Sequence, residues 1–88
     1  MARFEVRDSE AGTMGASAQA DVLLEMGLMY ATGRDCEVDL IAAHKWLNIA
    51  AINGSERAVV LRSELAASMS KVEIAKALRA ARDWMTMH

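Results

Sequence analysis

The chain contains no proline, and its 88 residues include one cysteine, one phenylalanine and one tyrosine. Apolar residues make up 53% of the chain and are dominated by alanine, leucine and methionine. These three residues form helices well and have little preference for strands. The composition therefore predicts one small all-α domain. Because so short a chain buries only a modest core, any uncovered apolar face matters to it.

Long apolar runs are also missing. Charged residues interrupt every candidate helix before it reaches the roughly 20 apolar residues that a membrane span needs. The single thiol, Cys36, cannot close a disulfide within the chain, and the N-terminal sequence MARFEVRDSE is too charged to be the core of a secretory signal. We therefore expect a cytoplasmic protein without a membrane span.

The N-terminal segment, residues 1–16, has no helical period and is predicted to be disordered, with Phe4 and Val6 as candidate docking residues. The rest of the chain, residues 17–88, is predicted to be one helical domain. Its connections are short, which makes consecutive helices antiparallel neighbours. The four helices are expected at residues 17–31, 39–52, 55–68 and 70–88.

Local signals place the ends of these helices. Asp39 is a good N-cap for the second helix, and Ser55 for the third. Gly54 suits a left-handed C-cap between them. Ser70 and Glu73 have the spacing of a capping box at the start of the fourth helix.

The second half of the sequence repeats the pattern of the first. A period in the thirties is typical of solenoid folds, which stack helical units. A chance match between two alanine-rich helix pairs would explain the aligned alanines equally well, but the only two tryptophans also align. A shift of 38 residues pairs Ala20 with Ala58, Leu23 with Leu61, Leu40 with Leu78, Ala43 with Ala81 and Trp46 with Trp84.

One set of residues has the order and spacing of a known helical repeat: Gly27, Tyr30, Gly33, Asp39, Ala43, Trp46, Ala50, Ala51, Gly54 and Ala58. With this framework, residues 20–58 resemble one unit of the Sel-one-like repeat family, a relative of the tetratricopeptide repeat. The resemblance implies an α-α superhelix of about four antiparallel helices. In such a unit the small residues let helices approach, and the tryptophan fills the space between them.

The second unit departs from this pattern. Leu65, Ser68 and Lys71 stand where the repeat has Gly, Tyr and Gly, whereas Trp84 is retained. We therefore expect one clear unit followed by a degenerate unit that caps the stack. In the first unit, Asp35 occupies a loop position where the family usually has glycine.

The resemblance implies binding without catalysis. Members of the family are adaptors and scaffolds that hold other proteins on concave surfaces, often in bacterial signalling, and the repeat itself carries no catalytic residues. We therefore expect a non-catalytic adaptor or scaffold with a protein partner, no cofactor and no small-molecule substrate. The residues that contact a partner vary in this family, so none is transferred.

Residues that could carry chemistry have simpler roles. Asp35, Glu37 and Asp39 alternate like the start of a calcium loop, but Leu40 stands at the position that requires glycine. A solvated loop with a helix cap explains them. His44 is expected on the exposed side of its helix without a second metal ligand, and Cys36 is expected to be a packed small residue. We predict no catalytic, cofactor-binding or metal-binding residues.

A nucleic-acid-binding helix-turn-helix is the alternative function. Residues 55–88 carry 6 basic and 4 acidic groups, although the whole chain has a net charge of −2, which argues against a nucleic acid. The segment LAASMSKVEIAKALRAARDWM has a helix, a short turn and a second helix, but its turn lacks the usual glycine. The cations of this second helix are Lys71, Lys76, Arg79 and Arg82.

The first helix carries the candidate interaction surface. Leu24, Leu28 and Met29 lie beside its core stripe and are expected to form an exposed apolar strip, because two units are fewer than a solenoid usually needs. Methionine is common on adaptable binding surfaces, although it also fills gaps in cores. We expect a homodimer through this region, or a protein that is stable only with its partner bound.

Overall fold

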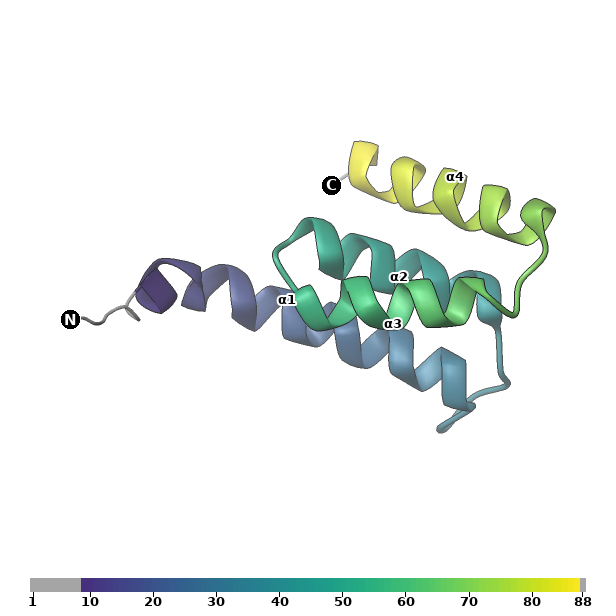
Figure 1. The fold of residues 1–88 in the computed structure, drawn as a ribbon, viewed down its shortest axis with the longest axis horizontal. Helices are drawn as coiled ribbons and strands as arrows, with labels where there is room; N and C mark the ends of the chain where they lie inside the picture. Colours follow the sequence, from purple (N-terminus) through teal and green to yellow (C-terminus); the bar gives the residue numbers. More distant parts are fainter. Residues whose placement is uncertain (1–8, 88) are drawn as a thin grey trace.

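The structure, a computed structural model, describes residues 9–87 of the chain and the side chains of residues 18–87. The described part consists of helices and turns, without a strand, and confirms the predicted all-α fold (Figure 1). Among these residues no helix is both long and apolar enough to span a membrane. The helices are α1 (Ser9–Thr32), α2 (Leu40–Ile52), α3 (Glu56–Ala66) and α4 (Lys71–Met87).

Helix α1 is longer than the sequence indicates. It begins at Ser9, roughly two turns before the expected start at residue 17, so residues 9–16 are helical where disorder was expected. An existing helix gains one backbone hydrogen bond for each residue added, which favours this extension. The N-terminal part of α1 extends away from the other helices (Figure 1). Phe4 and Val6, the candidate docking residues, lie outside the described residues.

The predicted caps are present at the helix starts. The Asp39 carboxylate accepts a hydrogen bond from the backbone N–H of Ala42 at 3.0 Å. The hydroxyl of Ser55 caps α3 in the same way. Ser70 and Glu73 form the reciprocal pair, in which each backbone N–H donates to the side chain of the other residue, at 2.9 and 3.1 Å. Each such cap stabilises a helix by about 1 kcal/mol.

Helix α2 is the centre of the fold, because α1, α3 and α4 all pack against it (Figure 1). The contact with α1 is close at Gly27, where an added Cβ would lie 2.8 Å from Leu47 Cδ2. Leu47 is 1% exposed, and Ala43 and Ala50 are fully buried. The small residues of the predicted framework therefore do allow α1 and α2 to approach closely.

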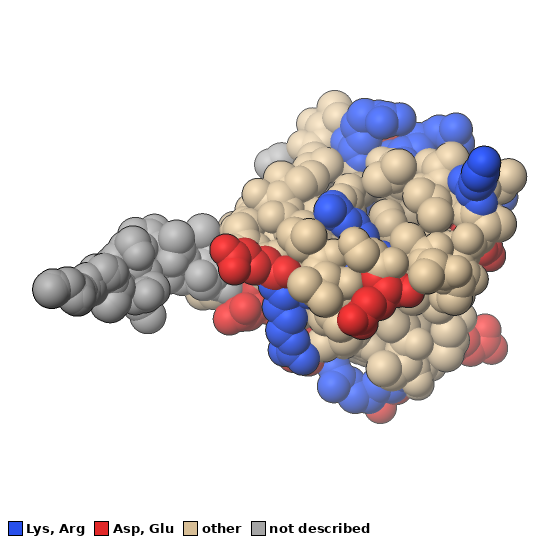
Figure 2. All heavy atoms as spheres, in the orientation of Figure 1, with Lys and Arg blue, Asp and Glu red and all other residues tan. Residues whose placement is uncertain are grey.

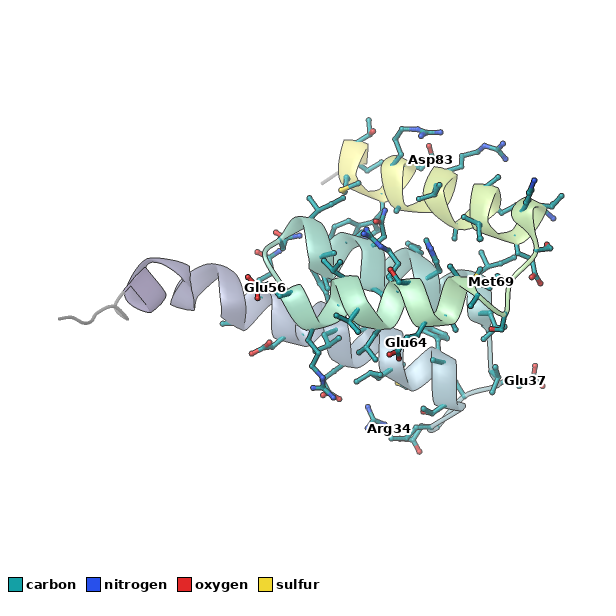
Figure 3. The ribbon with its side chains drawn as sticks, viewed as in Figure 1. Arg34, Glu37, Glu56, Glu64, Met69 and Asp83 are labelled. Atoms are coloured by element: carbon teal, nitrogen blue, oxygen red, sulfur yellow. The ribbon has the colours of Figure 1, made fainter. Side chains whose placement is uncertain are left out.

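The second helix pair is held together mainly through α2. The alignment of the two halves explains this, because Leu65 stands where α1 has Gly27, and a leucine prevents an equally close approach. Met69, in the turn between α3 and α4, is buried (Figure 3). Helical periodicity predicts Val60 and Leu78 on the apolar faces of α3 and α4, but they are 56% and 42% exposed.

The two aligned tryptophans meet in the structure. The rings of Trp46 on α2 and Trp84 on α4 are 5.4 Å apart between centroids and are inclined by 77°, which is an edge-to-face contact. Both side chains are half-buried and pack against the core cluster. The Lys45 ammonium nitrogen lies 4.3 Å from the centre of the Trp46 ring. The tryptophan pair thus joins α4 to α2.

The turn between α1 and α2 contains a strained position. Asp35 has φ +62°, in the left-handed region that glycine adopts without strain. We expect Asp35→Gly to raise the free energy of unfolding by about 0.5–1 kcal/mol, because removal of the strain outweighs the entropy that glycine adds to the unfolded chain. Asp35→Ala is the matched control and should lower it. Urea unfolding of the three proteins checks this, and an alanine variant as stable as the glycine variant would contradict the strain.

Candidate interaction surface

An apolar groove of about 280 Å³ runs between α1 and α3. Leu47 of the central helix forms its floor and is 1% exposed. One wall comes from α1 and the other from α3, and the polar groups lie on the α3 side. Figure 3 shows Glu64 on the side of α3 that faces α1. The lining residues are Leu28, Ala31, Leu47, Leu61, Glu64, Leu65 and Ser68.

Helical spacing brings these side chains together. Leu28 and Ala31 are three residues apart on α1, and Leu61 and Leu65 are four residues apart on α3, so each pair lies on one face of its helix. Ser68 lies in the turn after α3, and its hydroxyl donates to the Leu65 carbonyl at 2.9 Å. The groove is therefore lined mainly by apolar side chains, with one carboxylate at Glu64.

The predicted surface on α1 is only partly present. Leu24 belongs to the core and is 4% exposed, so the expected exposed strip of three residues is not formed. Leu24 belongs to the same buried cluster as Leu47 of α2. Leu28 is half-buried and lines the groove. Met29 is half-buried, and its carbonyl accepts hydrogen bonds from the backbone N–H groups of Gly33 and Arg34 at 2.9 and 3.1 Å.

The α3 wall was missed by reasoning from sequence. Helical periodicity places Leu61 and Leu65 on the apolar face of the third helix. Both pack against the core cluster there, but they are half-buried and also line the groove. The repeat pattern could have predicted this wall, because stacked repeat units place their first helices, α1 and α3, side by side and leave a groove between them.

His44 does not lie on an exposed face. Its side chain is 3% exposed, and its Nδ1 has no hydrogen-bond partner among the described residues. Burial lowers the pKa of the imidazole, and the nearby positive charge of Arg62 lowers it further. One turn later, Asn48 is 8% exposed and accepts a hydrogen bond from the Arg62 guanidinium. The expectation was wrong because three helices surround α2 and leave it little free surface.

The other candidate chemical residues have structural contacts. The Cys36 thiol is half-buried and donates to the Met29 carbonyl at 3.6 Å. Asp39 is used as a cap, as described above, while Asp35 and Glu37 are exposed. In the part of the chain that the structure describes, no three His, Cys, Asp or Glu side chains are grouped to hold a metal ion.

The repeat framework occupies both core and surface. Gly54 has φ +107°, and the backbone N–H of Asn53 beside it donates to the Ile49 carbonyl at 3.0 Å, consistent with the predicted turn. Of the framework residues, the buried ones are Gly27, Ala43, Ala50 and Ala58, the half-buried ones are Tyr30, Gly33, Trp46, Ala51 and Trp84, and the exposed ones are Asp39 and Gly54.

The cations of α4 lie on its exposed face. Lys71, Lys76, Arg79 and Arg82 are all exposed, and Figure 2 shows basic side chains gathered over the edge of the molecule that α4 forms. In a helix-turn-helix the two helices cross at roughly 90–120°. Here α4 runs back in the direction opposite to α3 and packs against α2 (Figure 1). This arrangement favours an α-α hairpin over the alternative motif.

Comparison of the chain with models of protein families, with curated proteins and with solved structures finds no match.

Proposed function

We propose that this chain is a short Sel-one-like repeat domain that acts as a non-catalytic adaptor, and that the groove between α1 and α3 receives a helix of its protein partner. The observation that carries the proposal is the groove itself, which is apolar, has the buried Leu47 as its floor and lies between α1 and α3. An amphipathic helix buries its apolar face well in such a site.

Three features of the structure support the repeat. Gly27 makes a close contact that no other residue could make without displacing Leu47. Asp35 has a positive φ at the loop position where the family usually has glycine. The tryptophans that align under the 38-residue shift contact each other. These features are independent of one another, since one concerns helix packing, one a turn and one the relation between the two units.

The chemistry of the groove also indicates what the partner contributes. Besides Leu47, four aliphatic side chains line the groove, so the partner helix needs apolar residues at helical spacing to contact them. Glu64 offers a carboxylate at the rim. We therefore propose that the partner helix places a lysine or arginine opposite Glu64. A charge at this rim adds orientation and specificity more than affinity.

A pull-down from native lysate with identification by mass spectrometry tests the adaptor function. We expect Leu65→Lys to lose the protein that the wild-type chain recovers, because the substitution places an ammonium group in the apolar trough. Val60→Lys is the matched control, since Val60 is on the same helix and 56% exposed. Thermal melts establish that both variants fold. Equal recovery by all three proteins would contradict binding in the groove.

Self-association through the groove is part of the same proposal, because a second copy of the chain is one candidate partner. Light scattering coupled to size exclusion measures it at micromolar concentration. A dimer that Leu65→Lys returns to a monomer places the second copy in the groove. A well-folded, stable wild-type monomer would contradict the expectation of a homodimer or of a protein that is stable only with its partner bound.

A further inference from the structure

Helix α3 buries few of its residues against α2. Of its eleven residues only Ala58 is buried, while Leu61 and Leu65 are half-buried. Its contact with α2 includes a polar pair, in which the Arg62 guanidinium donates to the side-chain oxygen of Asn48. A helix held by few apolar contacts opens at a lower free energy than the rest of a domain.

An imidazole lies beside this polar pair. His44 precedes Asn48 by one turn of α2 and is 3% exposed, and its Nδ1 has no partner among the described residues. The neutral imidazole can be buried at this position because it carries no charge to desolvate. A charged ring would be buried beside the guanidinium of Arg62, where desolvation and repulsion both oppose it.

The charge that acts on the His44 imidazole opposes its protonation. Arg62 of α3 is the charged group that acts on the ring, and it is of the wrong sign. The residues that α1 and α4 bury against the core are apolar: Ala20, Leu23, Leu24, Ala77 and Ala81. Separation of α2 from α3 would therefore stabilise the protonated His44, because it exposes the ring to water and moves Arg62 away.

We propose that α3 is an acid-released latch, in which protonation of His44 detaches α3 from α2 and thereby removes the Leu61 and Leu65 wall of the groove. The effect on partner binding rests on the proposed function, whereas the movement of α3 does not. The sign follows from the proton balance. Burial and Arg62 lower the pKa of His44 in the closed form, so the open form binds the proton more readily and gains population as the pH falls below about 6.5.

Amide hydrogen exchange of the free full-length chain tests the latch, at pH values from 7.5 to 5 and corrected for the intrinsic exchange rate. We expect the opening constant of α3 amides to rise by up to ~10-fold per pH unit below 6.5, until the closed form is itself protonated. The amides in the middle of α2 should respond much less. His44→Leu should abolish the pH response of α3.

Arg62→Gln is the second variant, because glutamine can still donate to Asn48 but carries no charge. It should reduce the pH response without abolishing it, and it keeps the test valid if His44→Leu does not fold. An equal rise in exchange across α1, α2 and α3 would mean global unfolding and would overturn the latch. So would an unchanged response in either variant. Because no partner is present in this experiment, a negative result would contradict the latch without contradicting the adaptor function. A failed pull-down would likewise contradict the adaptor function without contradicting the latch.

Discussion

Leu47→Ala lowers the free energy of unfolding by about 2–5 kcal/mol, which is the largest effect that we expect from a single substitution. Leu47 is 1% exposed and lies at the centre of the fold, where it fills the space under Gly27 and forms the floor of the groove. Loss of its side chain leaves a cavity between α1 and α2. Because small domains have only about 5–15 kcal/mol of stability, a large part of the total is lost.

Leu78→Ala is the matched control for this prediction. The same atoms are removed, but Leu78 is 42% exposed on α4, so the expected loss is below ~1 kcal/mol, since little transfer free energy and no cavity are involved. Urea unfolding of both variants measures the difference. Equal losses would mean that α2 is not the central helix.

Trp46→Ala has the second-largest expected effect, a loss of about 3 kcal/mol, at the lower end for tryptophan because the ring is half-buried. The substitution removes the edge-to-face contact with Trp84 and the cationic contact with Lys45. Helix α4 should loosen from α2 in this variant.

A double-mutant cycle with Trp84→Ala isolates the ring contact. We expect a coupling free energy of about 0.5–1.5 kcal/mol between the two tryptophans, measured by urea unfolding. Trp46→Phe should retain most of the stability, because an aromatic ring remains in place. Simple additivity of the two alanine substitutions would show that the repeat tryptophans do not support each other.

Local features could be predicted well from the sequence. Asp39, Ser55, Ser70 and Glu73 cap helices at the expected positions, because a cap needs only a side chain and a backbone N–H within three residues. The all-α class follows from composition for a similar reason. Neither depends on how the helices are arranged in space.

Predictions about the faces of helices were less successful. His44 and Leu24 were both expected at the surface, and both are buried. A sequence period identifies one apolar stripe, but α2 contacts three helices on different sides, so polar residues on it are buried as well. Leu24 lies at core spacing on α1 and is buried there, so only its assignment to the exposed strip was wrong.

The groove could be predicted only in part. Its α1 wall includes Leu28, which reasoning from sequence placed on the candidate surface, whereas Leu61 and Leu65 were expected only on the apolar face of α3 and also pack against the core. Core and groove residues have the same spacing on a helix. What separates them is whether another element covers them, and that depends on the packing of the whole domain.

Site-specific photo-cross-linking tests the central claim most directly. A photoreactive phenylalanine analogue is placed at Ser68, at the groove, and separately at Ala75 on the exposed face of α4, and each protein is irradiated in native lysate. We predict an adduct between the Ser68 probe and the protein recovered in the pull-down, lost when Leu65→Lys is added. An adduct that forms only from Ala75, or that persists with Leu65→Lys, would contradict an adaptor that binds its partner between α1 and α3.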